Sequence, residues 1–540
     1  MPLGFHACVL GFLALAVSGV VCADAPANLS ASTPSQPQPP VMASASASDT
    51  VAAPQAAKLI LNPTTFAQLL LLRSLEIEYS RYSKDVAQQM AQSEAALYET
   101  VMYGNYRKTD TLRQRTTEEK ALTYMINNNP YLLNESSKNA EMGIKQLLPS
   151  GAELTIGGRI VERANNIMAI SQTDLEVTSA LVITIKQPLL KGAGVTVTEA
   201  DKRVAEYESM IQSWQYRQQL LKVMGDGLSM FWQTYMAQQV AQLRLEMYRT
   251  AEALVVDARQ RVLAGKLPPR SIQELERFRL TRHADWVRFQ QNANEMQSRM
   301  VNLLNYRRSD VAAIDLIPTR VDVPSALTQG ESSLNYALDN WAPFQVSRLK
   351  VAQGRVRLAY AANQRLPSLD FQYSYSSSGM AEAFRPSASL VKQNLYPDWW
   401  VGLNFEMGLN GGEKARSQFQ AQHLRVIQSE TELAAVRLSL ENDLISRREE
   451  LNSTRQEVEI YQNDVKLKTA LRQSEWARFQ SGLGLVSSLL QADQDLLDAR
   501  VRLLDAMGRV ETAQLALLLA NGTLLEAHNV QAQLPQTSLQ

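Results

Sequence analysis

The chain has almost no cysteine and little histidine. Its two cysteines, Cys8 and Cys22, both lie near the N-terminus, and its four histidines are far apart in the sequence. These side chains supply most protein zinc ligands and all disulfides, so we expect no disulfide framework and no metal site. Gly192 and Gly194 are not followed by the Lys-Ser/Thr of a phosphate loop, and no nucleophile–base constellation is recognisable. The sequence therefore predicts neither a cofactor nor an enzyme.

Long apolar runs and a charge imbalance are also absent. After the N-terminus, no stretch approaches the ~18 consecutive apolar residues that a transmembrane helix needs. If the chain crosses a membrane, we expect it to cross with strands. The 54 basic side chains equal the 54 acidic ones, which argues against a nucleic-acid partner.

The N-terminal segment has the pattern of a secretory signal. An apolar run from Cys8 to Cys22 precedes Ala23, and Val21 and Ala23 suit the cleavage positions. We expect a signal peptide at 1–23, although Cys22 leaves open a lipid anchor, for which Val21 is a poor neighbour. Residues 24–58 are rich in Ala, Ser and Pro, so we expect a flexible leader there.

Two pairs of segments alternate between apolar and polar side chains, which indicates strands. The predicted strands are 152–163 and 175–187 in the first half, and 367–376 and 398–407 in the second. Each is about as long as a tilted strand that crosses hydrocarbon. The side chains expected to face lipid are Leu154, Ile156, Leu181, Ile183, Ile185, Phe371, Tyr373, Trp399, Val401 and Leu403. Residues 106–142 are polar and show no clear pattern.

Four strands cannot close a barrel, and an open sheet edge in lipid would leave backbone groups unpaired. The strand pattern therefore predicts an oligomer, at least a dimer. A soluble sheet with one buried face is the alternative interpretation of the same strands.

Each second strand leads into a very long helical pattern. From residue 489 onward, apolar side chains recur at spacings of three and four, which is typical of coiled coils. Gly265 and Gly482 interrupt the long helices, and Pro268 with Pro269 reinforces the first break. Gly192 and Gly411 are 219 positions apart, and Gly265 and Gly482 are 217 apart. This near-constant offset predicts an internal two-fold repeat.

Three motifs carry a family resemblance. The segments Gln187 to Gly192, Arg365 to Leu369, and Arg478 with Gly482 resemble the TolC family of bacterial outer-membrane efflux proteins. The resemblance runs from about residue 59 to residue 522. It implies a first repeat over 59–320, a second over 321–522, and a polar tail over 523–540.

The resemblance also implies a fold that is mainly α with a small β part. Long coiled-coil helices would form a trimeric α-barrel, and four transmembrane strands per chain would build a shared 12-stranded β-barrel. The glycine-containing hairpin tips would contact a periplasmic adaptor. The tip residues are Arg261, Leu263, Ala264, Gly265, Lys266 and Leu267, then Arg478, Ser481, Gly482, Leu483 and Gly484.

The pore entrance departs from the family pattern. Relatives carry two acidic residues, three apart, just after the second tip, where this chain has Ser488 and Gln491. The corresponding positions of the first half are Ser271 and Glu274, and Asp493 is a nearby acid. We take these five residues as candidates for the pore entrance.

From these observations we expect the outer-membrane exit channel of a tripartite efflux system in a Gram-negative bacterium. It would be a homotrimer in outer-membrane lipid with most of its chain in the periplasm. It would conduct small molecules passively, through an adaptor, from an inner-membrane pump. Two alternatives stay open, a type I protein secretion duct and a soluble periplasmic coiled-coil scaffold.

Overall fold

The computed structural model describes residues 57–123, 132–166, 168, 175–306, 311–318, 331–408, 412–528 and 530. The predicted signal peptide and all but the last two residues of the predicted leader lie outside these ranges. The chain divides into two compact units. The strand unit contains Tyr98–Thr198 and Leu366–Leu409, and the helical unit contains Pro54–Leu97, Glu199–Arg365 and Asn410–Gln540.

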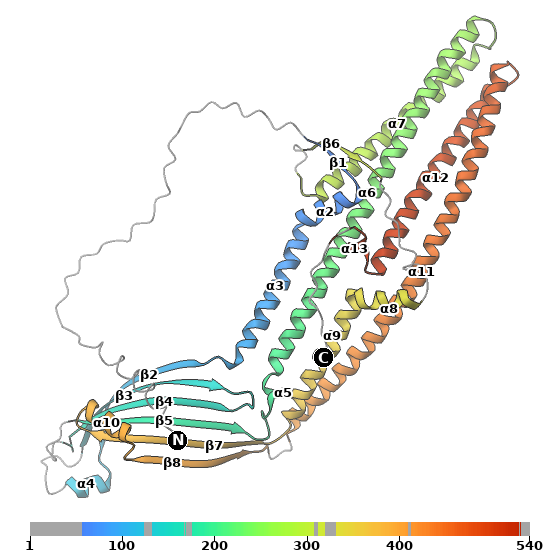
Figure 1. Ribbon diagram of the computed structural model, residues 1–540. Coiled ribbons are helices and arrows are strands. Elements are labelled where there is room, and N and C mark those ends of the chain that lie inside the picture. Colours follow the sequence, from blue (N-terminus) through green and yellow to red (C-terminus); the bar gives the residue numbers. More distant parts are fainter. Residues whose placement is uncertain are drawn as a thin grey trace, which may run out of the picture. The chain divides into compact units, whose positions relative to one another are not determined.

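The strand unit is built on one antiparallel sheet in the order β2-β3-β4-β5-β7-β8 (Figure 1). Its strands are β2 (Val101–Gln114), β3 (Leu132–Leu147), β4 (Glu153–Asn165), β5 (Glu176–Pro188), β7 (Ser368–Ala381) and β8 (Pro397–Glu406). Three short helices accompany them, α4 (Thr117–Thr123), α5 (Val195–Thr198) and α10 (Phe384–Gln393). Strands β4, β5, β7 and β8 correspond to the four strands that the alternating side chains predicted.

The count of four strands was wrong, because the sheet has six. The two additional strands, β2 and β3, come from the polar segment that showed no clear pattern. β7 also continues beyond its predicted end at residue 376 to Ala381, and α10 follows it. β2 and β8, at the two ends of the sheet, each have one edge that pairs with no other strand among the described residues.

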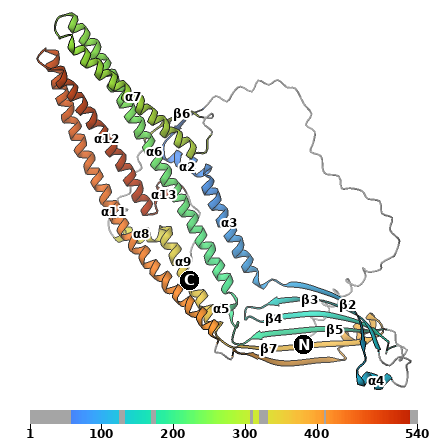
Figure 2. The same ribbon diagram turned by 180° about the vertical axis from the view of Figure 1, so that it is seen from behind.

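The helical unit contains two long antiparallel helix hairpins (Figure 2). The first consists of α6 (Ala200–Leu263) and α7 (Arg270–Leu303), and the second of α11 (Glu413–Gln480) and α12 (Val486–Ala520). The 64 residues of α6 and the 68 of α11 correspond to roughly 100 Å each at 1.5 Å per residue. None of the described helices is both long and apolar enough to cross a bilayer.

Shorter elements complete this unit. The helices are α2 (Pro63–Arg73), α3 (Leu75–Ala95), the 3-10 turn η1 (Ala96–Tyr98), α8 (Glu331–Asn340), α9 (Ala342–Asn363) and α13 (Leu524–Ala527). Strands β1 (Ala57–Leu61) and β6 (Val311–Leu316) form a small parallel pair. Asn62 caps α2, because its side chain accepts a hydrogen bond from the Thr65 backbone at 2.7 Å.

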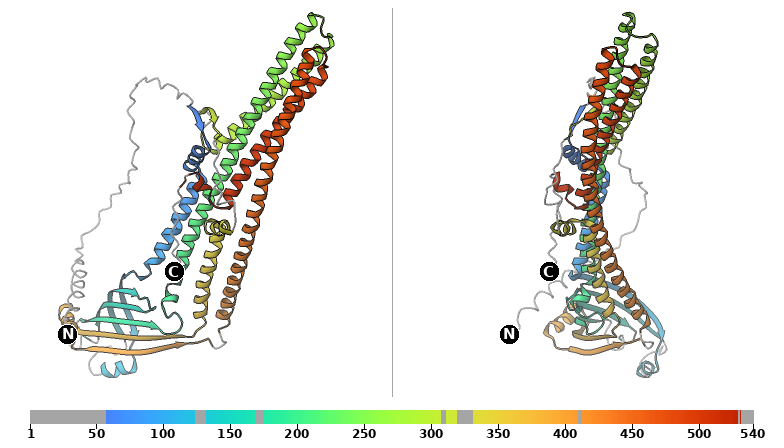
Figure 3. Two further views of the ribbon diagram at one scale, coloured as in Figure 1. Left: turned by 45° about the vertical axis from the view of Figure 1, so that its right-hand side comes forward. Right: turned by 90° about the vertical axis from the view of Figure 1, so that its right-hand side faces the viewer.

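The helices pack as a layer rather than a globule (Figure 3). Along the first part of α6 the layer runs α3, α6, α9, α11, and along the rest it runs α7, α6, α12, α11. The predicted heptad side of α12 is buried in this layer, and Leu489 and Leu517 are fully enclosed. Thus α11 forms one edge of the layer, and α3 and α7 form the other.

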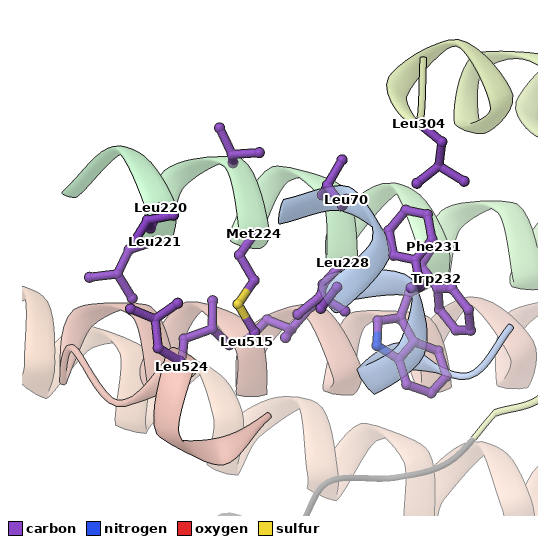
Figure 4. Packing of buried hydrophobic residues seen from close by; sticks show 14 of the residues in the cluster. Leu70, Leu220, Leu221, Met224, Leu228, Phe231, Trp232, Leu304, Leu515 and Leu524 are labelled. Atoms are coloured by element: carbon purple, nitrogen blue, oxygen red, sulfur yellow. The ribbon is translucent and has the colours of Figure 1, made fainter. Parts of the chain in front are cut away.

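The largest core lies where α2 crosses α6 (Figure 4). Phe66 and Leu70 from α2 pack on Met224, Leu228 and Phe231 from α6, and all five are fully buried. A Cβ at Gly227 would lie 2.1 Å from the Leu70 side chain, so the close approach of the two helices depends on this glycine. This core fixes α2, and with it the start of α3, against the first hairpin.

Candidate functional site

Both helix hairpins end in a glycine in the left-handed conformation. Gly265 has φ +70° and Gly482 has φ +76°. The amide of Lys266 donates to the carbonyl of Arg261 at 2.8 Å, and the amide of Leu483 donates to that of Arg478 at 3.0 Å. These bonds close the last helical turn in the way that a glycine C-cap does. A Cβ at either glycine would meet no atom within 4 Å, so only the backbone conformation requires glycine.

The two predicted tips lie side by side. Arg261 donates to the carbonyl of Gln480 at 3.3 Å, and its guanidinium lies 5.2 Å from the centre of the Phe479 ring. Phe479 is buried together with Leu254 and Leu489 in a core shared by both hairpins. The structure therefore brings the two predicted sets of tip residues together and gives Arg261 a bridging position between them.

The tips expose apolar side chains beyond that core. Leu263 is 88% exposed and Leu483 is 79% exposed, while Ala264, Gly265 and Lys266 are also exposed. Leu267 and Gly484 are partly covered. Exposed leucines at a helix end leave apolar surface for a partner to cover.

The five entrance candidates separate into two groups. Ser271 and Asp493 are buried, whereas Ser488 and Gln491 are exposed and Glu274 is partly exposed. Asp493 accepts a hydrogen bond from Arg472 at 2.8 Å, so its charge is paired within the second hairpin. Ser271 is the second residue of α7, which begins at Arg270. The structure does not gather these candidates into one cluster.

Charged pairs that the sequence did not reveal hold the hairpins together near this end. Lys468 on α11 lies 3.4 Å from Asp495 on α12, and Gln491 donates to Asp495 at 2.8 Å. These two neighbours lower the pKa of Asp495, with the Gln491 bond as the larger cause. Lys468 and Asp495 are 27 positions apart, on the two helices of a hairpin, so no short sequence motif contains both.

A buried arginine joins the two hairpins. Arg282 on α7 donates to Gln494 on α12 and lies 3.8 Å from Asp285. Its burial lowers the pKa of the guanidinium. From the sequence, Arg282 only interrupts an apolar pattern, but in the structure it supplies the polar link between α7 and α12.

All ten residues predicted to face lipid lie on one face of the sheet. The ladder pairs Leu154 with Ile185, Ile185 with Tyr373, and Tyr373 with Val401, and directly paired residues share a face. The opposite face carries polar side chains such as Thr184 and Ser374, whose hydroxyls are 3.2 Å apart. The common face follows from the register, whereas contact with lipid stays a prediction.

Apolar side chains form a stripe along the free side of α3. Leu75, Tyr79, Tyr82, Val86 and Met90 recur at spacings of three and four, and each is more than half exposed. The last three also line a shallow groove on this helix. Because α3 packs against α6, this stripe is a coiled-coil surface without a partner in the described protomer. We call these five residues the α3 seam.

A second stripe lies on the other edge of the layer. Leu424, Leu438, Ile445, Ile460 and Leu467 are spaced by multiples of seven or nearly so along α11, and each is more than half exposed. Since α11 packs against α9 and α12, this stripe also faces away from the layer. We call these five residues the α11 seam. The protomer thus has two different apolar edges.

Comparison with known proteins gives a family match over part of the chain and a shared fold over most of it. Residues 334–523 match the model of the outer membrane efflux protein family. A search of curated proteins found no significant sequence match. Among solved structures, the outer-membrane channel OprN is 12% identical with a TM-score of 0.61, over 85% of this chain and 90% of that one.

Two further channels are similar to the same degree. The outer membrane protein VceC from Vibrio cholerae is 10% identical with a TM-score of 0.60, over 85% of this chain and 96% of that one. The outer membrane channel CmeC from Campylobacter jejuni is 11% identical with a TM-score of 0.61, over 86% of each chain. The matching family model and the shared fold confirm the predicted resemblance to the outer-membrane efflux proteins of the TolC family.

Proposed function

We propose that this protein is the outer-membrane exit channel of a tripartite efflux system. Three copies would enclose a lumen, with the sheet in outer-membrane lipid and the helical unit in the periplasm. The channel would conduct small molecules passively, and a periplasmic adaptor would connect it to an inner-membrane pump. The resemblance to efflux proteins supplies the number of copies and the two partners.

The observation that carries the proposal is the pair of unlike apolar seams. The α3 seam and the α11 seam lie on opposite edges of one helical layer. When a surface on one copy binds a different surface on the next copy, the assembly closes into a ring if the rotation allows it. A ring of helical layers surrounds a lumen, which is what a conduit requires.

The sheet is a second observation that supports the same assembly. Its apolar face is exposed on β8, where Trp399, Val401, Leu403 and Phe405 are each more than half accessible. A face of this kind, with a polar face behind it, matches the outward and inward sides of a membrane strand. Such a sheet with two open edges is stable in lipid only when other copies pair with those edges.

Assembly and transport together test the proposal. In mild detergent we expect a mass near three chains of about 58 kDa each, the chain mass expected after signal removal. The oligomer should migrate differently on gels before and after boiling. A gene deletion should raise the susceptibility of cells to small toxic compounds. A clean monomer that stays folded without detergent would instead support the scaffold interpretation.

The adaptor can be tested at the tips. A photo-cross-linking residue at Lys266, which is exposed, should capture a periplasmic protein in cells. The matched control is the same residue at the exposed position Lys414, at the other end of α11. Equal capture from both positions would contradict a tip-specific partner.

A further inference from the structure

The hairpin of β2 and β3 is a continuous part of the sheet. β3 pairs with β4 over thirteen residue pairs, from Glu135 with Asn165 to Leu147 with Glu153. The edge of β4 is therefore already occupied within the protomer. A neighbouring copy could pair directly with β4 only if the hairpin left the sheet, so the free edges are those of β2 and β8.

The apolar face of the sheet extends onto this hairpin. Met142 and Ile144 on β3 pair with Gly158 and Ile156 on β4, so they lie on the face that carries the predicted lipid-facing residues. Met102 and Tyr106 on β2 continue it, and both are 66% exposed. A strand that merely covered the sheet edge in water would not need apolar side chains on this one face.

The apolar region crosses the sheet obliquely. On the apolar face, the first polar side chain is Ser377 on β7, and on β2 it is Lys108. Following the ladder from Ser377 across the sheet leads to Gly104, four residues before Lys108. Four residues correspond to ~13 Å along a strand, and four strand spacings to ~19 Å across the sheet, so the average incline from β7 to β2 is about 35°. The shift occurs between β7 and β4, because Glu162, Lys138 and Lys108 lie on one ladder line. Strands of outer-membrane barrels tilt by about 35–45°, and an apolar belt level with the membrane would produce this incline.

Polar contacts mark the end of the apolar region on both the earlier and the later strands of the sheet. On the first strands, Lys138 lies 3.0 Å from Glu162 just beyond the apolar region. On the later strands, α10 covers the small residues there, and the hydroxyls of Ser179 and Ser387 are 2.6 Å apart. A Cβ at Gly379 would lie 2.3 Å from the carbonyl oxygen of Ser387, so the contact requires glycine. The apolar belt thus has a defined end on five of the six strands, β2, β3, β4, β5 and β7.

We propose that each copy contributes six strands to the membrane barrel, and that β8 of one copy pairs with β2 of the next. This inference rests on the proposed function and replaces the twelve strands that the family resemblance implies with eighteen in a trimer. The strands alternate in direction from β2 to β8, so the joint between copies is antiparallel, like every other pairing in the sheet. Since barrel diameter grows roughly linearly with strand number, the barrel would be about 1.5 times as wide.

Disulfide cross-linking between copies tests the joint. Cys8 and Cys22 are the only native cysteines, so serine at both positions gives a clean background. The β2 variants are Asn105→Cys and Arg107→Cys, and each is combined with Trp400→Cys or Asn404→Cys on β8. All four side chains lie on the polar face of the sheet. We expect at least one combination to give covalent dimers and trimers on non-reducing gels.

The control combinations place one cysteine on β4 instead of β2. Thr155→Cys or Arg159→Cys, each with the same β8 partners, should give no covalent oligomer. Cross-links from β4 and none from β2, in trimers that still resist detergent, would overturn the six-strand barrel and leave the proposed function intact. A wild-type protein that never forms a detergent-resistant oligomer would overturn the proposed function, and the inference with it.

A second measurement follows the lipid contact of β2 itself. Tyr106→Arg places a charge in the apolar belt, and Asn105→Arg places it on the opposite face of the same strand. We expect Tyr106→Arg to reduce the trimer yield at least tenfold, as Leu181→Arg should, and Asn105→Arg to leave it within twofold of wild type. Equal yields from the two β2 variants would place β2 outside the bilayer.

Discussion

The two helix hairpins end in the same hydrogen-bonded turn, but different residues shape the chain that follows. After Gly265 comes Leu267, which packs on the shared core, and then Pro268 and Pro269. After Gly482 comes Gly484, where a Cβ would lie 2.7 Å from the backbone nitrogen of Phe479. The first turn is therefore shaped by prolines and the second by close backbone packing.

Two ion pairs, one from each hairpin, differ in burial. In the second hairpin, Asp493 is buried and pairs with Arg472. In the first, Arg259 and Glu276 form an ion pair in which the arginine side chain is 60% exposed. A buried pair leaves an uncompensated charge when one partner is removed, whereas an exposed pair is replaced by water at little cost.

The largest expected effect separates transport from assembly. Gly482→Asp adds a side chain where no protein atom lies within 4 Å, in a conformation that glycine favours. We expect a normal trimer level on unboiled gels and loss of export, measured as drug susceptibility. Gly265→Asp is the matched variant of the first tip. Normal export by both variants would remove the tips from the mechanism.

The next effect concerns the close packing that only the second tip has. Gly484→Ala places a methyl group against the Phe479 backbone, and we expect a loss of about 2–3 kcal/mol from overpacking. Gly482→Ala meets no neighbour and should cost about 1 kcal/mol through its positive φ alone. Thermal unfolding of the purified oligomers compares the two. Equal losses would mean that the chain around Gly484 accommodates the methyl group without overpacking.

A smaller effect should distinguish the two ion pairs. Asp493→Ala leaves Arg472 without its partner, and we expect a loss of about 2 kcal/mol, below the value for a fully buried pair because the arginine is partly exposed. Glu276→Ala breaks the exposed pair and should cost less than about 1 kcal/mol. Denaturant titrations of both variants supply the measurement, and a reversed order would contradict the comparison.

The smallest effect is electrostatic. Lys266 is the exposed cation of the first tip, and the second tip has Leu483 at the equivalent place. Lys266→Glu should weaken adaptor binding a few-fold at low salt and less at high salt, because ions screen exposed charges. Leu483→Glu should weaken binding without that salt dependence. Binding of the purified adaptor at two ionic strengths distinguishes the variants.

Much of this architecture could be predicted from the sequence. Strands β4, β5, β7 and β8 alternate clearly because one side is apolar and the other polar. β2 and β3 were not predicted, because the C-terminal half of β2 and the N-terminal half of β3 are polar on both faces. Lys138 and Glu162 illustrate this, since the two are recognisable as partners only after the strands are paired.

The candidate site was predictable to a similar extent. Gly265 and Gly482 could be found because a glycine that ends a long helix leaves a local signal in the sequence. The residue pairs that hold the hairpins together left no local signal in the sequence. Arg472 and Asp493 are 21 positions apart, and Arg282 and Gln494 are 212 apart, so only the packing of the helices reveals them.

The two unlike seams have a genetic consequence. In the proposed trimer, each copy would offer its α3 seam to one neighbour and its α11 seam to the other, so a copy with one disrupted seam would still join the ring at its intact edge. In a cell that makes equal amounts of wild-type and such variant chains, only about one ring in eight would be wholly wild type. A surface change that disrupts only the α3 seam, such as Tyr82→Asp, would then behave as a dominant-negative allele.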